Sequence, residues 1–344
     1  MYLGIWFLKG NAMKHTALLV SLLLGMAQAQ GLKDLAQKHD LLIGGAIDLR
    51  YLLDDPDYTD ILEKDFNVLV AENAMKMDAT EPQQNEFNFA LGDLLATYAS
   101  KHNMKLRGHT LLWHQQVPKW ITSGTWNKDE LEAIMKNHIQ TVAAHYQGKV
   151  FAWDVVNEAI SDSGGMRDTL WQKTLGDDYI ARAFRYAREA DPEAKLFYND
   201  YSSEGMNQKS NDVYALVKKL KEQGVPIDGV GMQMHLSVLN PPSMEEVAAN
   251  MKRLADLGLE VHITEFDVRS AGYPGTPAER HAAVGKLYGD VVKVCVQASN
   301  CTAFMTWGVA DNHTWLPGDS PLMYDGFYNP KPAYFAVQEA LKGQ

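Results

Sequence analysis

Residues 150–158 read VFAWDVVNE, a short apolar run that closes on an amide, Asn157, and a carboxylate, Glu158. The same order, apolar first and polar last, recurs along the chain in short segments separated by amphipathic stretches. This alternation of short apolar runs with helical patterns is typical of repeated strand–helix units. It disfavours a β-sandwich and a helix bundle.

Eight candidate strands follow this pattern, and they span residues 41–48, 67–73, 105–113, 150–158, 195–200, 229–235, 260–268 and 301–309. Helical patterns lie between them at 90–102, 129–146, 178–190, 207–222, 243–257 and 277–297. Asp129 and Ser243 stand where helix caps are expected. The sequence therefore predicts an α/β fold, a single (β/α)8 TIM barrel. No G-x-G-x-x-G motif follows the first strand, which disfavours the doubly wound alternative.

The composition fits one folded, soluble unit. The chain has 344 residues, of which 46% are hydrophobic and 22% are charged, close to the globular average. No Pro- or Ser-rich linker separates a second module, so residues 30–344 are predicted to form one barrel domain. The formal net charge of −11 argues against nucleic acid as a partner. This negative charge would not repel a neutral polymer, so a neutral polymeric ligand stays compatible with the composition.

The N-terminal segment predicts a removable leader. A basic start at Met13 and Lys14 precedes an apolar run, and Ala27 and Ala29 form the small-x-small pattern of a cleavage site. We expect residues 1–29 to be a leader that starts at Met13 and is cleaved after Ala29, and the mature protein to be secreted or periplasmic. The alternative is a membrane anchor, for which the apolar run is short, so no stable anchor is expected.

Two cysteines, Cys295 and Cys301, lie six positions apart in a chain predicted to reach an oxidising compartment. We expect a local disulfide that clips a helix end to the following strand. The alternative is a pair of buried free thiols.

Polar and aromatic side chains gather where the predicted strands end. In a TIM barrel the C-terminal strand ends form the active-site face. Glu158 closes one strand and Glu265 closes another, in residues 261–267, VHITEFD. Cleavage of a glycosidic bond requires two carboxyl groups, one to protonate the leaving oxygen and one to stabilise or attack the oxocarbenium-like centre. A single strand-end Glu would be interpreted as a surface residue, but two in this setting predict a glycosidase.

From residue 32 to residue 341 the chain resembles glycoside hydrolase family 10, the β-1,4-xylanases. Residues 153–159, WDVVNEA, are similar to the family's acid/base strand, and residues 263–268, ITEFDV, to its nucleophile strand. The resemblance implies an endo-β-1,4-xylanase that retains the anomeric configuration through a covalent intermediate. Glu158 would be the general acid/base and Glu265 the nucleophile. No cofactor and no metal are implied.

The resemblance also implies the residues that bind xylan or xylo-oligosaccharides. Asn157 would hydrogen-bond the 2-hydroxyl of the sugar being cleaved, with a structural Asn as the alternative. The other implied contacts are Glu72, Asn73 and Lys76 in the glycone segment, His109 with Trp113 beneath the same sugar, Trp307 and Trp315 walling the central sugar, and Tyr201 on the leaving-group side. Trp120, Trp126 and Trp171 are expected to belong to the core.

Gln233 and His235 occupy alternate positions of one predicted strand, which would point both side chains to the same side. The resemblance implies that both also contact the substrate. In the family the histidine bonds the nucleophile and an aspartate, matched here by Asp267, bonds the histidine. A zinc site is the alternative for the histidines, but neither H-x-x-x-H nor H-E-x-x-H occurs. Phe266 departs from the family's aliphatic residue, and we expect its side chain to face the helices.

Two other function classes stay open. Another β-glycanase, such as a cellulase or mannanase, could share this two-glutamate barrel, because a fold does not fix a substrate. A non-catalytic glycan-binding protein or a structural barrel is disfavoured by the paired carboxylates and the polar strand ends. The sequence does not predict the oligomeric state or the preferred xylan decoration.

Overall fold

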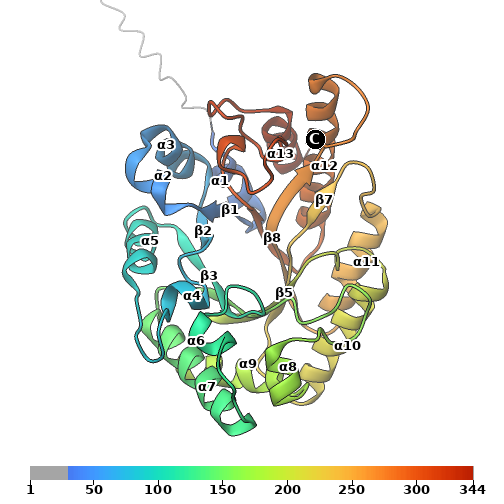
Figure 1. Ribbon diagram of the computed structural model, residues 1–344. Coiled ribbons are helices and arrows are strands. Elements are labelled where there is room, and N and C mark those ends of the chain that lie inside the picture. The colour runs from blue at the N-terminus through green and yellow to red at the C-terminus, as the bar shows by residue number, and fades with distance from the viewer. Residues whose placement is uncertain (1–29, 344) are drawn as a thin grey trace, which may run out of the picture. The chain divides into compact units, whose positions relative to one another are not determined.

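The computed structural model describes residues 30–343, and from Gly31 onward they belong to one compact unit. The predicted leader at 1–29 lies outside the described residues. Figure 1 shows a ring of strands surrounded by helices.

Nine parallel strands build the sheet. They are β1 (Leu42–Ile47), β2 (Val68–Ala71), β3 (Lys105–Leu112), β4 (Ala152–Asn157), β5 (Lys195–Asp200), β6 (Gly229–Met232), β7 (His235–Ser237), β8 (Glu260–Arg269) and β9 (Cys301–Thr306). Strands β1 to β6 pair in chain order, β6 pairs with β8, β8 with β9, and β9 with β1. Eight strands therefore close a barrel, which confirms the predicted fold. The short β7 extends the sheet beside the far end of β8.

The helices wrap this barrel, as Figure 1 shows. They are α1 (Leu32–Ala36), α2 (Leu49–Asp54), α3 (Pro56–Asp65), α4 (Met77–Thr80), α5 (Ala90–Lys101), α6 (Lys119–Thr122), α7 (Lys128–His145), α8 (Leu170–Leu175), α9 (Tyr179–Ala190), α10 (Gln208–Glu222), α11 (Met244–Ala255), α12 (Pro277–Gln297) and α13 (Pro332–Lys342), with short 3-10 turns at Gln37–His39 and Asp311–His313.

Two predictions need correction. The predicted strand 229–235 is interrupted: β6 ends at Met232, Met234 has a φ of 58°, and His235 opens β7. A residue in this left-handed region breaks the extended backbone, so Gln233 and His235 do not share one strand. The cap of α7 is Asn127, whose side chain accepts from the backbone N of Glu130, and not Asp129. The cap at Ser243 is confirmed.

The predicted disulfide, Cys295–Cys301, links α12 covalently to β9. Phe266 is buried on the helix side of β8, where its ring packs edge-on against Tyr288 of α12 and beside Phe304 of β9. Both expectations are therefore confirmed. Within residues 30–343 no helix is long and apolar enough to cross a membrane.

Candidate active site

A cavity of about 560 Å³ opens at the C-terminal ends of the barrel strands. This is the usual size of a small-ligand site. Its walls bring together the glutamates, glycone-segment residues, amides, histidines and aromatic residues that the sequence singled out: Glu72, Asn73, Lys76, His109, Trp113, Asn157, Glu158, Tyr201, Gln233, His235, Glu265, Trp307 and Trp315. Gln115, Gln116 and Arg269 complete the lining. Asp267 lies behind the wall, against His235.

The two glutamates reach the cavity from β4 and β8, which are separated in the barrel ring by β5 and β6. Glu265 lies within β8, whereas Glu158 directly follows β4. Glu158 has a φ of 56°, in the left-handed region that L residues seldom adopt, and its backbone N donates to Asn199 O at 2.9 Å. Such strained backbone conformations cluster at functional sites because the surrounding structure must hold them in place.

Glu265 has a charged hydrogen-bond partner, His235. Its Oε2 lies 3.3 Å from His235 Nε2, and His235 Nδ1 lies 2.9 Å from Asp267 Oδ2. Burial would lower the pKa of His235, but the carboxylates of Asp267 and Glu265 raise it to about 10. Since carboxylates only accept, both ring nitrogens donate. Burial would likewise raise the pKa of Glu265, but the hydrogen bond from His235 and the nearby His109 hold it below the ordinary value. Glu265 is therefore ionised near neutral pH.

Glu158 is surrounded by neutral donors. Gln233 Nε2 donates to its Oε1 at 3.0 Å, Asn157 Nδ2 to the same oxygen at 3.1 Å, and Trp113 Nε1 to its Oε2 at 3.0 Å. The two carboxyl groups of one cavity thus differ: Glu265 has a cationic hydrogen-bond partner, His235, whereas the hydrogen-bond partners of Glu158 are all neutral. Such asymmetry is how one site assigns different roles to two carboxyl groups.

Asn199, at the end of β5, connects the two carboxyl groups. Its Nδ2 lies 2.7 Å from Glu265 Oε1 and 2.9 Å from Asn157 Oδ1, while its Oδ1 accepts from Thr264 at 2.7 Å. No role for Asn199 was predicted from the sequence. Its position at a polar strand end, two residues before Tyr201, was the available signal.

A buried ion pair supports the floor of the cavity, and the sequence analysis missed it as well. Asp154 binds the guanidinium of Arg107 and lies 3.0 Å from His109 Nδ1. Burial would raise the pKa of Asp154, but Arg107 and His109 lower it. Asp154 therefore fixes the His109 ring, which stands 5.2 Å from the Trp307 ring, centroid to centroid.

Lys76 is the buried cation of the cavity. Its Nζ donates to Asn73 Oδ1 at 2.9 Å and to Gln116 Oε1 at 2.7 Å, and it lies 5.1 Å from the centroid of the Trp113 ring. Burial lowers the pKa of Lys76, and the carboxylates of Glu265 and Glu72 partly oppose this. The glycone segment is thus a preformed cluster of donors and acceptors.

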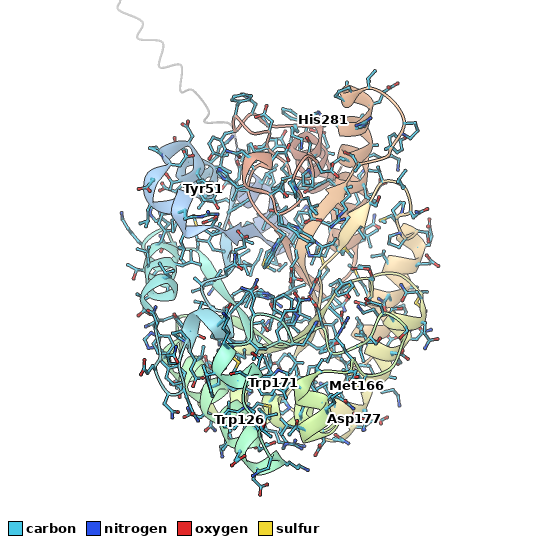
Figure 2. All side chains as sticks on the ribbon, viewed as in Figure 1. Tyr51, Trp126, Met166, Trp171, Asp177 and His281 are labelled. Carbon is cyan, nitrogen blue, oxygen red and sulfur yellow. A yellow bond between two sulfur atoms is a disulfide. The ribbon has the colours of Figure 1, made fainter. Side chains whose placement is uncertain are left out.

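The aromatic residues of the wall differ in exposure. Trp307 is 8% exposed, whereas Trp315 is 47% exposed and is anchored by its Nε1, which donates to Asp267 Oδ2 at 2.7 Å. Tyr201 is held from outside the cavity, where its hydroxyl donates to Asp162 and accepts from Arg167. Trp120, Trp126 and Trp171 do not line the cavity, and Figure 2 shows Trp126 and Trp171 beside α6 to α9.

A larger hollow of about 660 Å³ lies between the segment after β7 and α12. Its charged groups, Glu279, Lys286 and Asp290, belong to one solvent-facing helix, and the glutamates at the ends of β4 and β8 do not reach it. We therefore place the functional site at the barrel mouth. Across residues 30–343 no cluster of His, Cys, Asp or Glu is arranged to hold a metal ion.

Comparison with known proteins gives a consistent assignment. Residues 31–340 match the profile of glycosyl hydrolase family 10. The chain is 39% identical to endo-1,4-beta-xylanase B of Thermotoga neapolitana, covering 96% of this chain and 98% of that one. It is 41% identical to exoglucanase XynX of Acetivibrio thermocellus, covering 87% of this chain and 28% of that one. The crystal structure of xylanase 10B from Thermotoga petrophila in complex with xylobiose superposes with a TM-score of 0.90 at 40% identity, covering 93% and 99% of the two chains.

Proposed function

The chain belongs to glycosyl hydrolase family 10, and on that basis we propose that it is an endo-β-1,4-xylanase that cleaves internal bonds of xylan with retention of the anomeric configuration. One observation carries the assignment of roles. Two glutamates line one cavity, and the histidine beside Glu265 holds that carboxylate ionised while Glu158 is bound by neutral amides and an indole. An ionised carboxylate suits a nucleophile, and a carboxyl among neutral donors suits a proton carrier.

In the first step Glu265 attacks the anomeric carbon, and the bond from that carbon to the leaving oxygen breaks. Glu158 gives its proton to the leaving oxygen, so the departing chain leaves as an alcohol. The product is a covalent glycosyl-enzyme. His235, which shares its two protons between Glu265 and Asp267, loses its charged partner Glu265 at this stage and keeps Asp267.

In the second step water attacks the same carbon from the side that the leaving group vacated. Glu158, now ionised, takes the proton from water, and the bond to Glu265 breaks. Two displacements restore the original configuration. Asn199 and Asn157, which connect the two carboxyl groups, would hold them at constant geometry through both steps.

The cavity wall supports a set of sugar contacts. Asn157 would bind the 2-hydroxyl of the central sugar, where a contact that strengthens in the transition state accelerates the reaction. Glu72, Asn73 and Lys76 would bind the glycone, with His109 and Gln233 near the central sugar and Tyr201 on the leaving-group side. Trp113 contributes its indole N–H to Glu158, so we propose that it positions the acid in addition to forming the wall.

Trp307 and Trp315 supply a reason for selectivity. Both line the cavity, and an aromatic wall beside the central sugar would crowd the hydroxymethyl group that glucose carries and xylose lacks. The xylobiose bound in the related Thermotoga petrophila structure supports a xylo-oligosaccharide as the ligand class. Beechwood xylan, carboxymethylcellulose and mannan, offered separately, test this selectivity. We expect reducing ends to be released rapidly from xylan alone, and a faster release from cellulose would overturn the substrate assignment.

The acidic limb of the activity profile tests the role of His235. Because the hydrogen bond from His235 lowers the pKa of Glu265, His235→Asn is expected to raise that pKa. Glu265 would then be protonated at a higher pH, and the acidic limb of kcat/KM on xylan would move to higher pH. His281→Asn, on α12 away from the cavity (Figure 2), is the control and should leave the limb in place. An unmoved limb in His235→Asn would contradict this role.

A further inference from the structure

Arg269 carries a positive charge and lines the cavity, but the proposed reaction assigns it no role. It is the last residue of β8, four positions beyond Glu265, and its side chain is exposed. Other arginines around the barrel are paired with carboxylates: Arg107 with Asp154, Arg167 with Asp162, Arg182 with Glu132 and Arg188 with Asp228. Within the described part of the chain Arg269 forms no such ion pair.

The backbone at Arg269 is fixed from both sides. Its carbonyl oxygen accepts from Val238 N at 3.0 Å, next to the pairing of β7 with β8. The following residue, Ser270, donates its backbone N and its hydroxyl to the carboxylate of Asp319, at 3.1 and 2.8 Å. The side chain therefore starts from a rigid position, which suits a binding residue.

The side chain is directed along the sugar wall. The central guanidinium carbon of Arg269 stands 5.3 Å from the centroid of the Trp315 ring, within the range of a cation–π contact. Trp315 in turn is anchored to Asp267, the aspartate that holds His235. The guanidinium thus lies at a defined place beside a half-exposed tryptophan, and its planar set of N–H donors matches a carboxylate.

Most charged groups that line the cavity are carboxylates or already paired cations, so the charge of Arg269 would matter for binding an acidic ligand. Glu72, Glu158 and Glu265 line the cavity, and the formal net charge of the chain is −11. The other cationic side chains of the lining are already hydrogen-bonded: Lys76 donates to Asn73 and Gln116, and His235 donates to Glu265 and Asp267. Among the described residues of the lining, Arg269 is therefore the exposed cation that remains for an acidic group on the substrate.

We propose that Arg269 binds a carboxylate carried by the substrate, namely the uronic acid side group of glucuronoxylan, when the substituted sugar lies beside Trp315. Arg269 is then a residue that determines specificity for acidic over neutral decorations. The inference rests on the proposed xylanase function, and it selects among the decorations that the sequence left open.

Three kinds of ligand with the same xylose backbone test the proposal. The first is a linear xylo-oligosaccharide, and the second is the same oligomer with a glucuronosyl side group, placed on each sugar in turn. The third is the methyl ester of the second. The acid and its ester have nearly the same size and differ in charge. In the unmodified protein we expect kcat/KM for the acid to exceed that for the ester by about fivefold at one position of the side group, as for a partly exposed charge-assisted contact. Added salt should reduce this ratio.

Arg269→Met should bring the acid-to-ester ratio to about one, because methionine keeps an unbranched apolar side chain but carries no charge. Arg269→Lys should keep part of the ratio, since lysine supplies charge without the planar pair of donors. Arg185→Met, an exposed arginine on α9, is the matched control and should keep the full ratio.

A ratio in Arg269→Met equal to that of the unmodified protein would overturn the inference, as would an equal loss on all three ligands, which would indicate a structural role. If the unmodified protein cleaves the linear oligomer but does not prefer the acid to its ester, the inference fails and the proposed function stands. If it cleaves none of the three ligands, the proposed function fails and the inference fails with it.

Discussion

Glu265→Ala is expected to lower kcat on xylan by roughly 10⁴- to 10⁶-fold, the loss typical of removing a covalent nucleophile. Alanine leaves nothing to attack the anomeric carbon and no charge to stabilise the oxocarbenium-like transition state. The measurement is the release of reducing ends from xylan, with protein folding checked by circular dichroism. Glu260→Gln is the matched control, because Glu260 lies at the other end of the same strand and pairs with Lys195 outside the cavity.

Azide separates the loss of a nucleophile from a general loss of structure. In Glu265→Ala a small anion can occupy the space of the missing carboxylate and attack an activated aryl β-xylobioside from the α face. The expected product is an α-glycosyl azide, formed in one displacement. Formation of the β-azide instead, or a residual activity on xylan above one hundredth of the unmodified level, would contradict the nucleophile role.

Glu158→Ala is expected to produce a loss that depends on the leaving group. Protonation of the leaving oxygen is essential for a sugar, so kcat/KM on xylan should fall by roughly 10²- to 10⁴-fold. A 2,4-dinitrophenolate leaves without a proton, so kcat/KM on the corresponding β-xylobioside should fall by less than about tenfold. Measuring kcat/KM on both substrates with one preparation of Glu158→Ala gives the difference between the two losses directly.

Two further results would identify the same residue as the base of the second step. Azide should restore turnover of the aryl glycoside by Glu158→Ala and give the β-glycosyl azide, because it attacks the glycosyl-enzyme from the face of the departed group. The basic limb of the pH profile should disappear as well. Glu193→Ala, an exposed glutamate before the opposite end of β5, is the control. Equal losses on xylan and on the aryl glycoside would contradict the acid role.

Local patterns predicted most of the barrel. The runs around Ile43 and Phe197 are apolar and short, and their strands were placed within two residues because buried parallel strands have few alternatives. The sixth strand was predicted too long, since its residues alternate regularly through 235 while the backbone turns at Met234. That turn depends on tertiary contacts, such as the hydrogen bond from Met234 N to the buried carboxylate of Glu204.

Most residues of the cavity wall were predicted from motifs, whereas Gln115, Gln116 and Arg269, and the contacts between the wall residues, were not. Glu158 and Glu265 stand out because each ends an apolar run. Asn199 and Arg107 do not stand out, since their importance arises from partners 65 and more than 40 residues away, Thr264 and Asp154. The hydrogen bond from Trp113 to Glu158 and the position of Arg269 over Trp315 likewise depend on side-chain directions that a single sequence does not contain.

The anomeric configuration of the first product distinguishes double displacement from direct attack by water. Proton NMR during hydrolysis of xylan by the purified protein distinguishes the anomers before they interconvert. Double displacement at Glu265, with Glu158 as acid and base, predicts that the β-anomer appears first and that Glu265→Ala produces neither anomer at a comparable rate. Initial release of the α-anomer would contradict the account, because it would require water to attack directly and would leave Glu265 without a covalent role.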